Sequence, residues 1–257
     1  MHFLVFLAIL FYIGQVYFIP SSSIFMGMED KVIQKLVRET DPLVSSVDRD
    51  EFISASETAF DCRFDGTSKF YPWKMPDKLP KKFKIGVIVG SSGSGKSTLL
   101  KQFGTEEQPT WDPNKSIISH FENPDDGIKR LSSVGFNTIP SWYKPYHVLS
   151  NGEKFRADLA RKIKSGAVID EYTSVVDRTV AKAASMALSR YIKKNDVENV
   201  VLCTCHHDIV EWLEPDWVLD TDTGELLHGF FLSDQKSLSK FIVQQMIVGE
   251  CLKTITI

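Results

Sequence analysis

The chain has 257 residues, 43% of them hydrophobic and 25% charged, and its formal net charge is −3. This is ordinary globular composition, long enough for one large α/β domain with appendages or for two small domains. No global basic excess points to nucleic acid. The four cysteines form neither a disulfide framework nor a paired metal motif, so we expect a reducing, cytoplasmic environment.

The N-terminal segment 1–25 contains an apolar run at 3–19 that is near the lower limit for crossing a bilayer. Four interpretations stay open: a signal peptide, a membrane anchor, a buried core helix, or an over-called start ahead of Met26 or Met28. No basic residue precedes the run and no small-residue cleavage site follows it, which disfavours a signal peptide. Basic residues follow it, so an anchor would leave the bulk of the chain facing the cytosol.

After this segment the pattern predicts a polar, helical region up to about residue 60, with its first helix ending near Glu39. Residues 61–83 are aromatic and basic, and prolines prevent any long element there. From Phe83 to about residue 230, strand and helix signals alternate, which predicts a parallel sheet covered by helices. The expected domains are therefore 1–25, 26–82, 83–230 and a helical tail at 231–257.

A buried strand is predicted over 85–89, and a phosphate-binding motif follows it. The motif, G-x-x-x-x-G-K-[ST], is formed by Gly90, Ser91, Ser92, Gly93, Ser94, Gly95, Lys96 and Ser97. Its glycines let backbone N–H groups converge on phosphates, and a predicted helix containing Leu99, Leu100 and Phe103 follows. We expect Lys96 to reach the β- and γ-phosphates of ATP, Ser97 to ligate Mg²⁺, and the site to extend to Thr98.

A second apolar strand is predicted at 167–169, and it ends in Asp170 and Glu171. At the end of a strand beside the phosphate loop, one acid can hold the magnesium shell while the next faces the γ-phosphate. Asp170 suits the metal role, and Glu171 suits activation of the attacking water.

Between these two strands, Ser150 and Glu153 form a capping-box pattern ahead of an amphipathic helix. The segment Leu149–Glu153 also resembles LSGGQ, the signature motif of ABC-type ATPases. Ser150 and Gly152 keep that pattern, whereas Asn151 replaces a glycine and Glu153 replaces the glutamine.

The order of the later motifs strengthens this resemblance. Residues 172–177, directly after Glu171, resemble the D-loop of the family and end in Asp177. A predicted helix at about 178–193 and a strand at 200–203 then lead to His206 and His207, one of which resembles the switch histidine. The resemblance covers about residues 83–225.

The resemblance implies an α/β fold of the P-loop NTPase, ABC type: a mainly parallel sheet flanked by helices, with a shortened helical subdomain. It implies an ATPase that forms a homodimer, in which Ser150 and Gly152 of one subunit close over the ATP of the other. It gives contacts with the nucleotide to Asp177 and to a switch histidine. His206 is preferred because it lies ten residues before Asp216, and His207 is the alternative because it precedes Asp208 directly.

Two elements of the family are not identified by sequence. No glutamine follows a strand where the Q-loop is expected, and His120, in a predicted strand at 116–121, takes its place. An adenine-stacking aromatic is expected upstream of the phosphate loop, where Phe70, Tyr71 and Trp73 are equivalent candidates.

Only 53 residues separate Lys96 from Ser150, which leaves no room for a transporter-type helical subdomain or a long coiled coil. The chain therefore resembles small stand-alone ABC ATPases that couple their cycle to a protein partner, here unidentified. Two alternatives stay open: the ATPase subunit of a membrane transporter, and a slow ATP-dependent clamp on nucleic acid.

Overall fold

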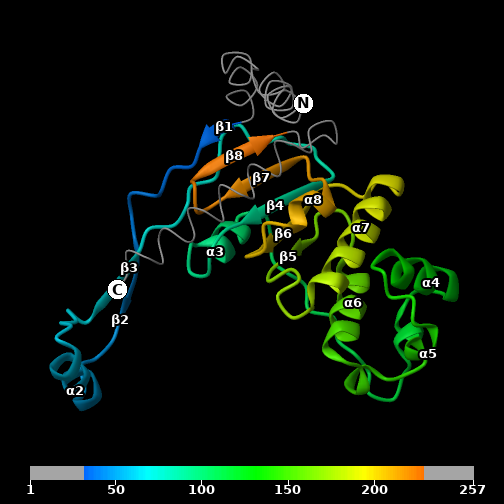
Figure 1. The fold of residues 1–257 in the computed structure, drawn as a ribbon, viewed down its shortest axis with the longest axis horizontal. Helices are drawn as coiled ribbons and strands as arrows, with labels where there is room; N and C mark the ends of the chain where they lie inside the picture. The colour runs from blue at the N-terminus through cyan, green and yellow to red at the C-terminus, as the bar shows by residue number, and fades with distance from the viewer. Residues whose placement is uncertain (1–31, 229–257) are drawn as a thin grey trace, which may run out of the picture.

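The computed structural model describes residues 32–228. Its centre is a six-stranded sheet with the order β1-β8-β7-β4-β6-β5 (Figure 1). Four of the strands run parallel to one another: β4 (Ile85–Val89), β5 (Val168–Ile169), β6 (Val200–Thr204) and β7 (Trp217–Asp220). On one side the sheet is extended by two antiparallel strands, β8 (Glu225–His228) and β1 (Val32–Lys35). The predicted α/β architecture with a mainly parallel sheet is confirmed.

Side chains of β4 alternate between two apolar cores, one on each face of the sheet. Val87 belongs to the larger core with residues of the helices on that face, among them Leu159 and Leu188. Ile88 belongs to the smaller core, with Leu99 and other residues. All five residues of β4 are buried, as expected for a central parallel strand covered on both faces.

Helices cover the two faces unequally. The larger core receives side chains from five α-helices: α4 (Pro124–Ser133), α5 (Ile139–Trp142), α6 (Asn151–Lys162), α7 (Arg178–Lys194) and α8 (Ile209–Leu213). The other face receives the short α3 (Lys96–Leu100). Between α3 and α6 the chain forms only short helical pieces: η3 (Ile117–His120), α4, α5 (Ile139–Trp142) and η4 (Tyr146–Val148). We call residues 117–164 the helical lobe.

A close approach inside the sheet requires glycine at position 86. A Cβ there would lie 2.0 Å from Cζ2 of Trp217, which is fully buried on the neighbouring strand β7. The Trp217 ring also stacks on Phe103 with 5.4 Å between centroids. Gly86 thus leaves the space in which the Trp217 side chain packs the turn after α3 against the sheet.

A separate unit precedes β4. It consists of β2 (Leu43–Ser46), α2 (Glu51–Phe60) and β3 (Thr67–Phe70), and β2 pairs with β3 alone in a two-stranded sheet. In Figure 1 this unit extends away from the main sheet. We call residues 41–70 the arm.

Three secondary-structure predictions are wrong. The helical region expected up to about residue 60 contains the strands β1 and β2 ahead of α2, because backbone pairing with β8 and with β3 outweighs the local helical pattern. The strand expected at 116–121 is the 3₁₀ helix η3, stabilised by turn hydrogen bonds such as Ser119 N–H to Ser116 O (3.1 Å). The helix after the phosphate loop ends at Leu100, and Phe103 lies in the turn that follows.

Two expectations fall outside the described residues: the apolar segment 1–25 and the helical tail 231–257. Within residues 32–228, no helix combines the length and apolarity needed to span a bilayer.

Candidate functional site

The phosphate loop joins β4 to α3. Three of its glycines have positive φ angles: 149° at Gly90, 78° at Gly93 and 97° at Gly95. Side chains of other residues are disfavoured in these conformations. Ser91, Ser92 and Ser97 are exposed, whereas Lys96 is only 7% exposed and its Nζ donates to Ser91 O at 2.7 Å. The loop thus has the curled shape that directs backbone N–H groups to one point.

Residues distant in the sequence hold this shape. Thr221, directly after β7, donates its hydroxyl to Val89 O (3.0 Å) and shares a hydrogen bond with Ser94 Oγ (2.7 Å). The Asp222 carboxylate accepts from the N–H and the hydroxyl of Ser91 at 2.9 and 2.7 Å. The loop between β7 and β8 therefore forms one wall of the phosphate loop.

Replacement of Gly90 by alanine tests this packing. A Cβ at Gly90 would lie 2.0 Å from Thr221 Oγ1, whereas a Cβ at Gly93 meets nothing within 4 Å. We expect Gly90→Ala to lower the free energy of unfolding by about 3 kcal/mol, because it adds a clash to an unfavourable φ. Gly93→Ala adds only an unfavourable φ and no clash, so we expect it to lower the free energy of unfolding by about 1 kcal/mol. Urea denaturation measures both, and equal losses would contradict the proposed wall.

The carboxylate strand end lies beside this loop. Ile169 of β5 pairs with Leu202 of β6, and β6 also pairs with β4, so three parallel strands end at one edge of the sheet. Burial, followed by the nearby charge of Asp170, raises the pKa of the Cys203 thiol, while Lys96 acts in the opposite direction. Cys203 of β6, the middle strand, therefore lies close enough to both Lys96 and Asp170 for their charges to affect its pKa.

This arrangement of strand, loop, lysine and carboxylate decides the fold type. The chain has the fold of a P-loop NTPase. Its phosphate loop follows β4, and Asp170 and Glu171 follow β5, one strand beyond the intervening β6.

Glu171 has an unusual backbone conformation for its residue type. Its φ angle is 50°, a region that non-glycine residues seldom adopt. Ser174 holds it there, since its hydroxyl contacts both Glu171 O (2.7 Å) and Glu171 Oε2 (2.5 Å). Asp170 accepts the Glu171 N–H at 2.8 Å, and its side chain is half-buried while Glu171 is exposed. The P-loop fold thus presents Glu171 to solvent in a fixed orientation.

The two histidines face different groups. Nδ1 of His206 lies 3.3 Å from Thr173 Oγ1, beside the carboxylate strand end. Burial and the charge of Arg178 lower the pKa of His206, although the acids Asp208 and Glu171 oppose this. His206 is therefore near Glu171 and is favoured in its neutral form.

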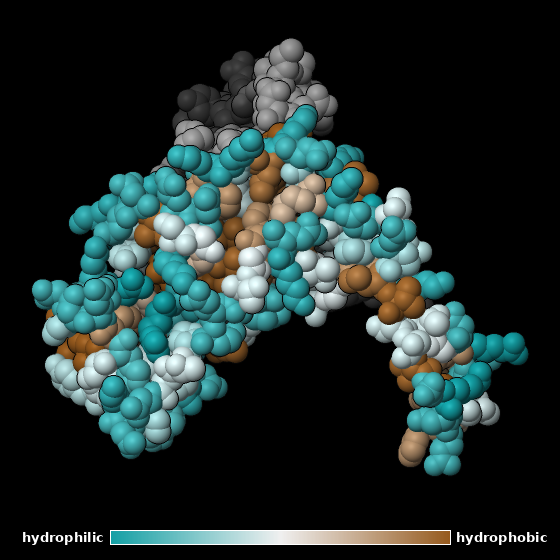
Figure 2. Space-filling view, turned by 180° about the vertical axis from the view of Figure 1, so that it is seen from behind, coloured by the Kyte–Doolittle hydropathy of each residue, from teal (hydrophilic) through white to brown (hydrophobic). Residues whose placement is uncertain are grey.

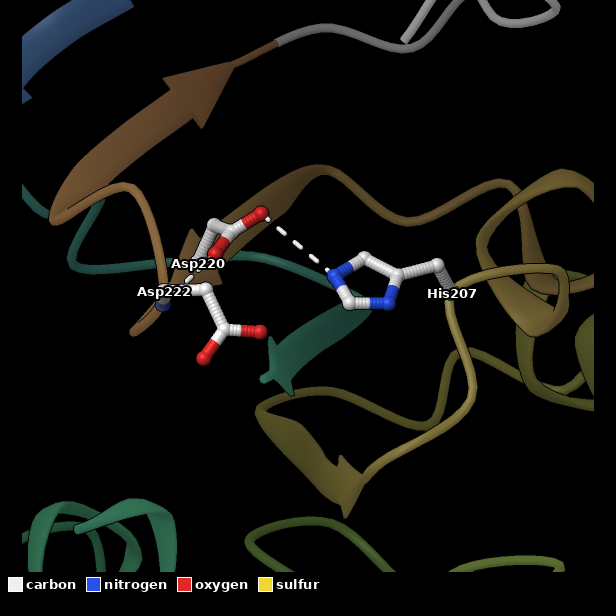
Figure 3. A group of neighbouring side chains, drawn as sticks. All are labelled: His207, Asp220 and Asp222. Carbon is white, nitrogen blue, oxygen red and sulfur yellow. Dashed lines mark hydrogen bonds and ion pairs between the residues drawn. The ribbon is translucent and has the colours of Figure 1, made fainter. Parts of the chain in front are cut away.

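His207 points the other way, toward the loop after β7 (Figure 3). Its Nε2 lies 3.5 Å from Oδ2 of the fully buried Asp220. One ligand atom from each of His207, Asp220 and Asp222 fits within 4.8 Å. Asp220 also accepts the N–H of Asp222 at 2.8 Å. Sequence analysis did not single out this cluster, although the acidic turn after a buried strand was visible.

The helix α6 begins with the predicted capping box. The Ser150 side chain accepts from Glu153 N at 3.4 Å, and Glu153 Oε2 accepts from Ser150 N at 2.9 Å. Hydrogen bonds from Ser141 first, and then from Ser150, lower the pKa of Glu153 to about 2. Glu153 therefore serves as an ionised cap at the position where the signature motif has glutamine.

The start of α6 lies next to the loop that precedes α7. A Cβ at Gly152 would lie 3.9 Å from Val176 Cγ1, one residue before Asp177. Asp177 itself caps α7, accepting from Thr179 N (2.9 Å) and Val180 N (3.0 Å). Within the described part of the chain, the side-chain hydrogen bonds of Ser150 involve Glu153 alone, so no such bond joins it to its own phosphate loop.

A cavity of about 620 Å³ lies between α6 and the carboxylate strand end. Its lining includes Asp170, Glu171 and Gln108, together with Asn151 and Lys154 of α6. Gln108 was missed by sequence reasoning because it lies on a loop, without the strand that the family pattern requires. His120, which the sequence suggested in place of the Q-loop glutamine, makes local hydrogen bonds instead: its Nε2 accepts from Asp112 N (2.9 Å) and its Nδ1 contacts Ser116 O (2.8 Å).

The three candidate aromatics differ in position. Trp73 is 9% exposed, and its Nε1 donates to Ser94 O at 3.0 Å, so this ring is bonded directly to the phosphate loop. Phe70 also borders the loop, because a Cβ at Gly95 would lie 2.6 Å from its Cζ. Tyr71 is 44% exposed. The Arg38 guanidinium lies over the Trp73 ring, 3.8 Å from its centroid.

Solved structures that the chain resembles include cassettes of ABC transporters. A dimeric structure of MJ0796, a bacterial ABC transporter cassette, has 14% identity and a TM-score of 0.44, over 60% of this chain and 87% of that one. Its post-hydrolysis form with ADP and Pi has 13% identity and a TM-score of 0.45, over 72% and 93%. CbiO1 from Clostridium perfringens has 20% identity and a TM-score of 0.43, over 66% and 87%. Scans of protein-family models and of curated proteins found no match.

Proposed function

We propose that the chain binds ATP at Gly90–Thr98 and hydrolyses it to ADP and phosphate, as an ABC-type ATPase. One observation carries the proposal: the phosphate loop follows β4 and the Asp170–Glu171 pair follows β5, the two parallel strands on either side of β6, and His206 follows β6 itself. Binding requires the loop amides and the Lys96 charge, and hydrolysis requires a carboxylate that faces solvent. Both requirements meet at this one edge.

The residues at this edge also fit a magnesium ion. Ser97 offers an exposed hydroxyl and Asp170 a half-buried carboxylate, and oxygen ligands of this kind are those that Mg²⁺ prefers. When bound, the ion would be held by Ser97 and Asp170 and would neutralise part of the phosphate charge, which favours attack at the γ-phosphorus.

Glu171 is the proposed general base. Its carboxylate accepts a proton from water as the water oxygen attacks the γ-phosphorus, and ADP leaves with the bridging oxygen. Ser174 orients the carboxylate through its contact with Oε2. The neutral His206 ring, next to Thr173, is the proposed hydrogen-bonding partner of the γ-phosphate, and Gln108 is a further polar group at the cavity.

A second copy of the chain is proposed to complete the site. Ser150 is exposed, and its side chain bonds within its own capping box and not to its own phosphate loop. Two-fold symmetry would bring Ser150 and Gly152 of each copy, with the adjacent Asp177, to the ATP of the other. ATP would then hold two subunits together, and hydrolysis would release them to drive a cytoplasmic protein partner.

The test is the mass of the Glu171→Gln variant in solution, measured by light scattering with and without Mg-ATP. We expect a monomer without nucleotide and a dimer with it, because glutamine preserves the binding groups but removes the base. A variant that binds ATP and stays monomeric at high concentration would overturn the self-dimer. A variant that does not bind ATP would overturn the whole proposal.

A further inference from the structure

The arm is a folded unit with no core of its own. None of the residues of α2 is buried, and all four residues of β2 are exposed. Nevertheless the unit is well formed: Asp50 caps α2 by accepting from Ile53 N (2.9 Å), and Glu57 pairs with Arg49 and accepts from Phe64 N (2.7 Å). An isolated two-stranded hairpin is marginally stable in water. A two-stranded unit that extends from the main sheet is therefore expected to be stabilised by contact with another surface.

Large apolar side chains lie on the outside of the arm. Phe60 is 81% exposed, Phe52 76%, Val47 56%, and Leu43 and Val44 are each 55% exposed. Figure 2 shows apolar side chains gathered along the arm, and a hollow that separates it from the rest of the molecule. Grouped exposure of this kind marks an interaction surface, whereas single exposed apolar residues are normal.

Charge indicates what covers the arm. The arm, residues 41–70, holds seven acidic and three basic side chains, a formal charge of −4. The helical lobe, residues 117–164, holds eight basic and five acidic side chains, a formal charge of +3. The helical lobe also exposes apolar residues: Tyr143 is 66% exposed, Val148 54% and Ile139 49%. The two surfaces are complementary in charge, and both have apolar side chains to bury.

Within one chain the two surfaces do not meet. Figure 1 shows the arm and the helices α4, α5 and α6 on opposite sides of the sheet. A contact between them therefore requires a second copy. The base of the arm is at the phosphate loop, since Phe70 borders Gly95 and Trp73 bonds to Ser94. In the dimer proposed above, this is where Ser150 of the partner arrives, bringing η4 and α6 with it.

We infer that the arm of each subunit binds the helical lobe of the other. Phe52 and Phe60 of the arm would contact the apolar side chains of the partner's lobe, and the acidic residues of the arm would face the basic side chains of that lobe. The inference rests on the proposed ATP-dependent dimer. Two-fold symmetry makes the contact twice, once from each arm. The arm would thus extend the interface beyond the nucleotide itself and select a second copy of this chain over other ATPases.

The test uses paired charge reversals in the full chain carrying Glu171→Gln, which we call the parent. The arm variant is Asp48→Lys with Glu51→Lys, and the lobe variant is Lys129→Glu with Lys144→Glu. All four side chains are exposed, and the structure assigns them no side-chain hydrogen bond. With Mg-ATP we expect each variant alone to dimerise about tenfold more weakly than the parent, because like charges face each other twice. The binding of Mg-ATP by the monomer is measured in parallel and should not change.

Mixing the two variants is the decisive step. In the mixed dimer one contact joins the reversed arm to the reversed lobe, and the other joins two unaltered surfaces, so both are complementary again. We expect the mixture to regain the dimerisation of the parent. Normal dimerisation of each variant alone, or a mixture as weak as its components, would overturn the contact between arm and lobe while leaving the ATPase proposal intact. A parent that stays monomeric with Mg-ATP would overturn both proposals.

A second variant tests the apolar part of the contact. Phe52→Ser with Phe60→Ser removes two exposed side chains, so we expect an unchanged melting temperature and weaker ATP-dependent dimerisation. Met186→Ser, an exposed apolar residue on α7, is the matched control and should dimerise like the parent. If the Phe52→Ser, Phe60→Ser double variant dimerised as strongly as Met186→Ser, the proposed apolar contact would be overturned.

Discussion

Glu171→Gln is expected to lower the rate of ATP hydrolysis by a factor of ~10²–10⁴ while leaving the affinity for ATP unchanged. A positioned general base contributes a factor of this size. The amide has the shape of the carboxylate but does not accept the proton of the attacking water. Steady-state phosphate release gives the rate, and equilibrium binding of Mg-ATP gives the affinity.

The control for this variant is Glu211→Gln. Glu211 is exposed on α8 and lies outside the edge where the phosphate loop and carboxylates meet, so hydrolysis should be unchanged. A Glu171→Gln enzyme that retains more than about a tenth of the normal rate would show that another group takes the proton. His206 and Asp170 would then be the next residues to replace.

Lys96→Ala is expected to raise the dissociation constant for ATP on the order of 100-fold. A charge-assisted hydrogen bond from a lysine that is 7% exposed contributes about 3 kcal/mol, and this substitution removes it entirely. Its partner in the described structure is the Ser91 carbonyl, which lies on an exposed residue, so we expect the fold to survive. Titration calorimetry with Mg-ATP measures the affinity, and circular dichroism checks the fold.

Lys101→Ala is the matched control. It removes an exposed lysine just after α3, directly beyond the five residues that begin with Lys96. ATP affinity within about twofold of normal is expected there, since exposed charges are screened by solvent. If both lysine variants bound ATP normally, the loop at 90–97 would not be the nucleotide site.

Predictions from the sequence succeeded where local pattern and tertiary structure agree. The apolar run before Gly90 is a strand because its side chains are buried on both faces, and the capping box at Ser150 begins α6 where its pattern indicates. Predictions failed where partners distant in sequence decide the outcome. β1 exists because β8 pairs with it, and the side-chain pattern of 32–35 carries no trace of that partner. The absence of a buried surface for α2 is equally invisible in its sequence.

The site shows the same division. The phosphate loop could be predicted as a motif, because each glycine is required by the local backbone. The positions of His206 and His207 could not, since two adjacent residues point to opposite neighbours, Thr173 and Asp220. Gln108 was overlooked because it lines the cavity from an irregular loop. The roles assigned to the individual site residues remain predictions for the variants above.

The wall formed by Thr221 and Asp222 has a consequence for the order of events during synthesis. The eight residues of the phosphate motif leave the ribosome as a unit, but the side chains that shape them are 127 and 131 positions further along. Contacts of such long sequence separation form late, because the intervening chain must be ordered first. A nascent chain ending before β7 therefore has the complete motif but lacks the side chains that shape it, so the proposed ATP site would form only when almost the whole described domain has been made.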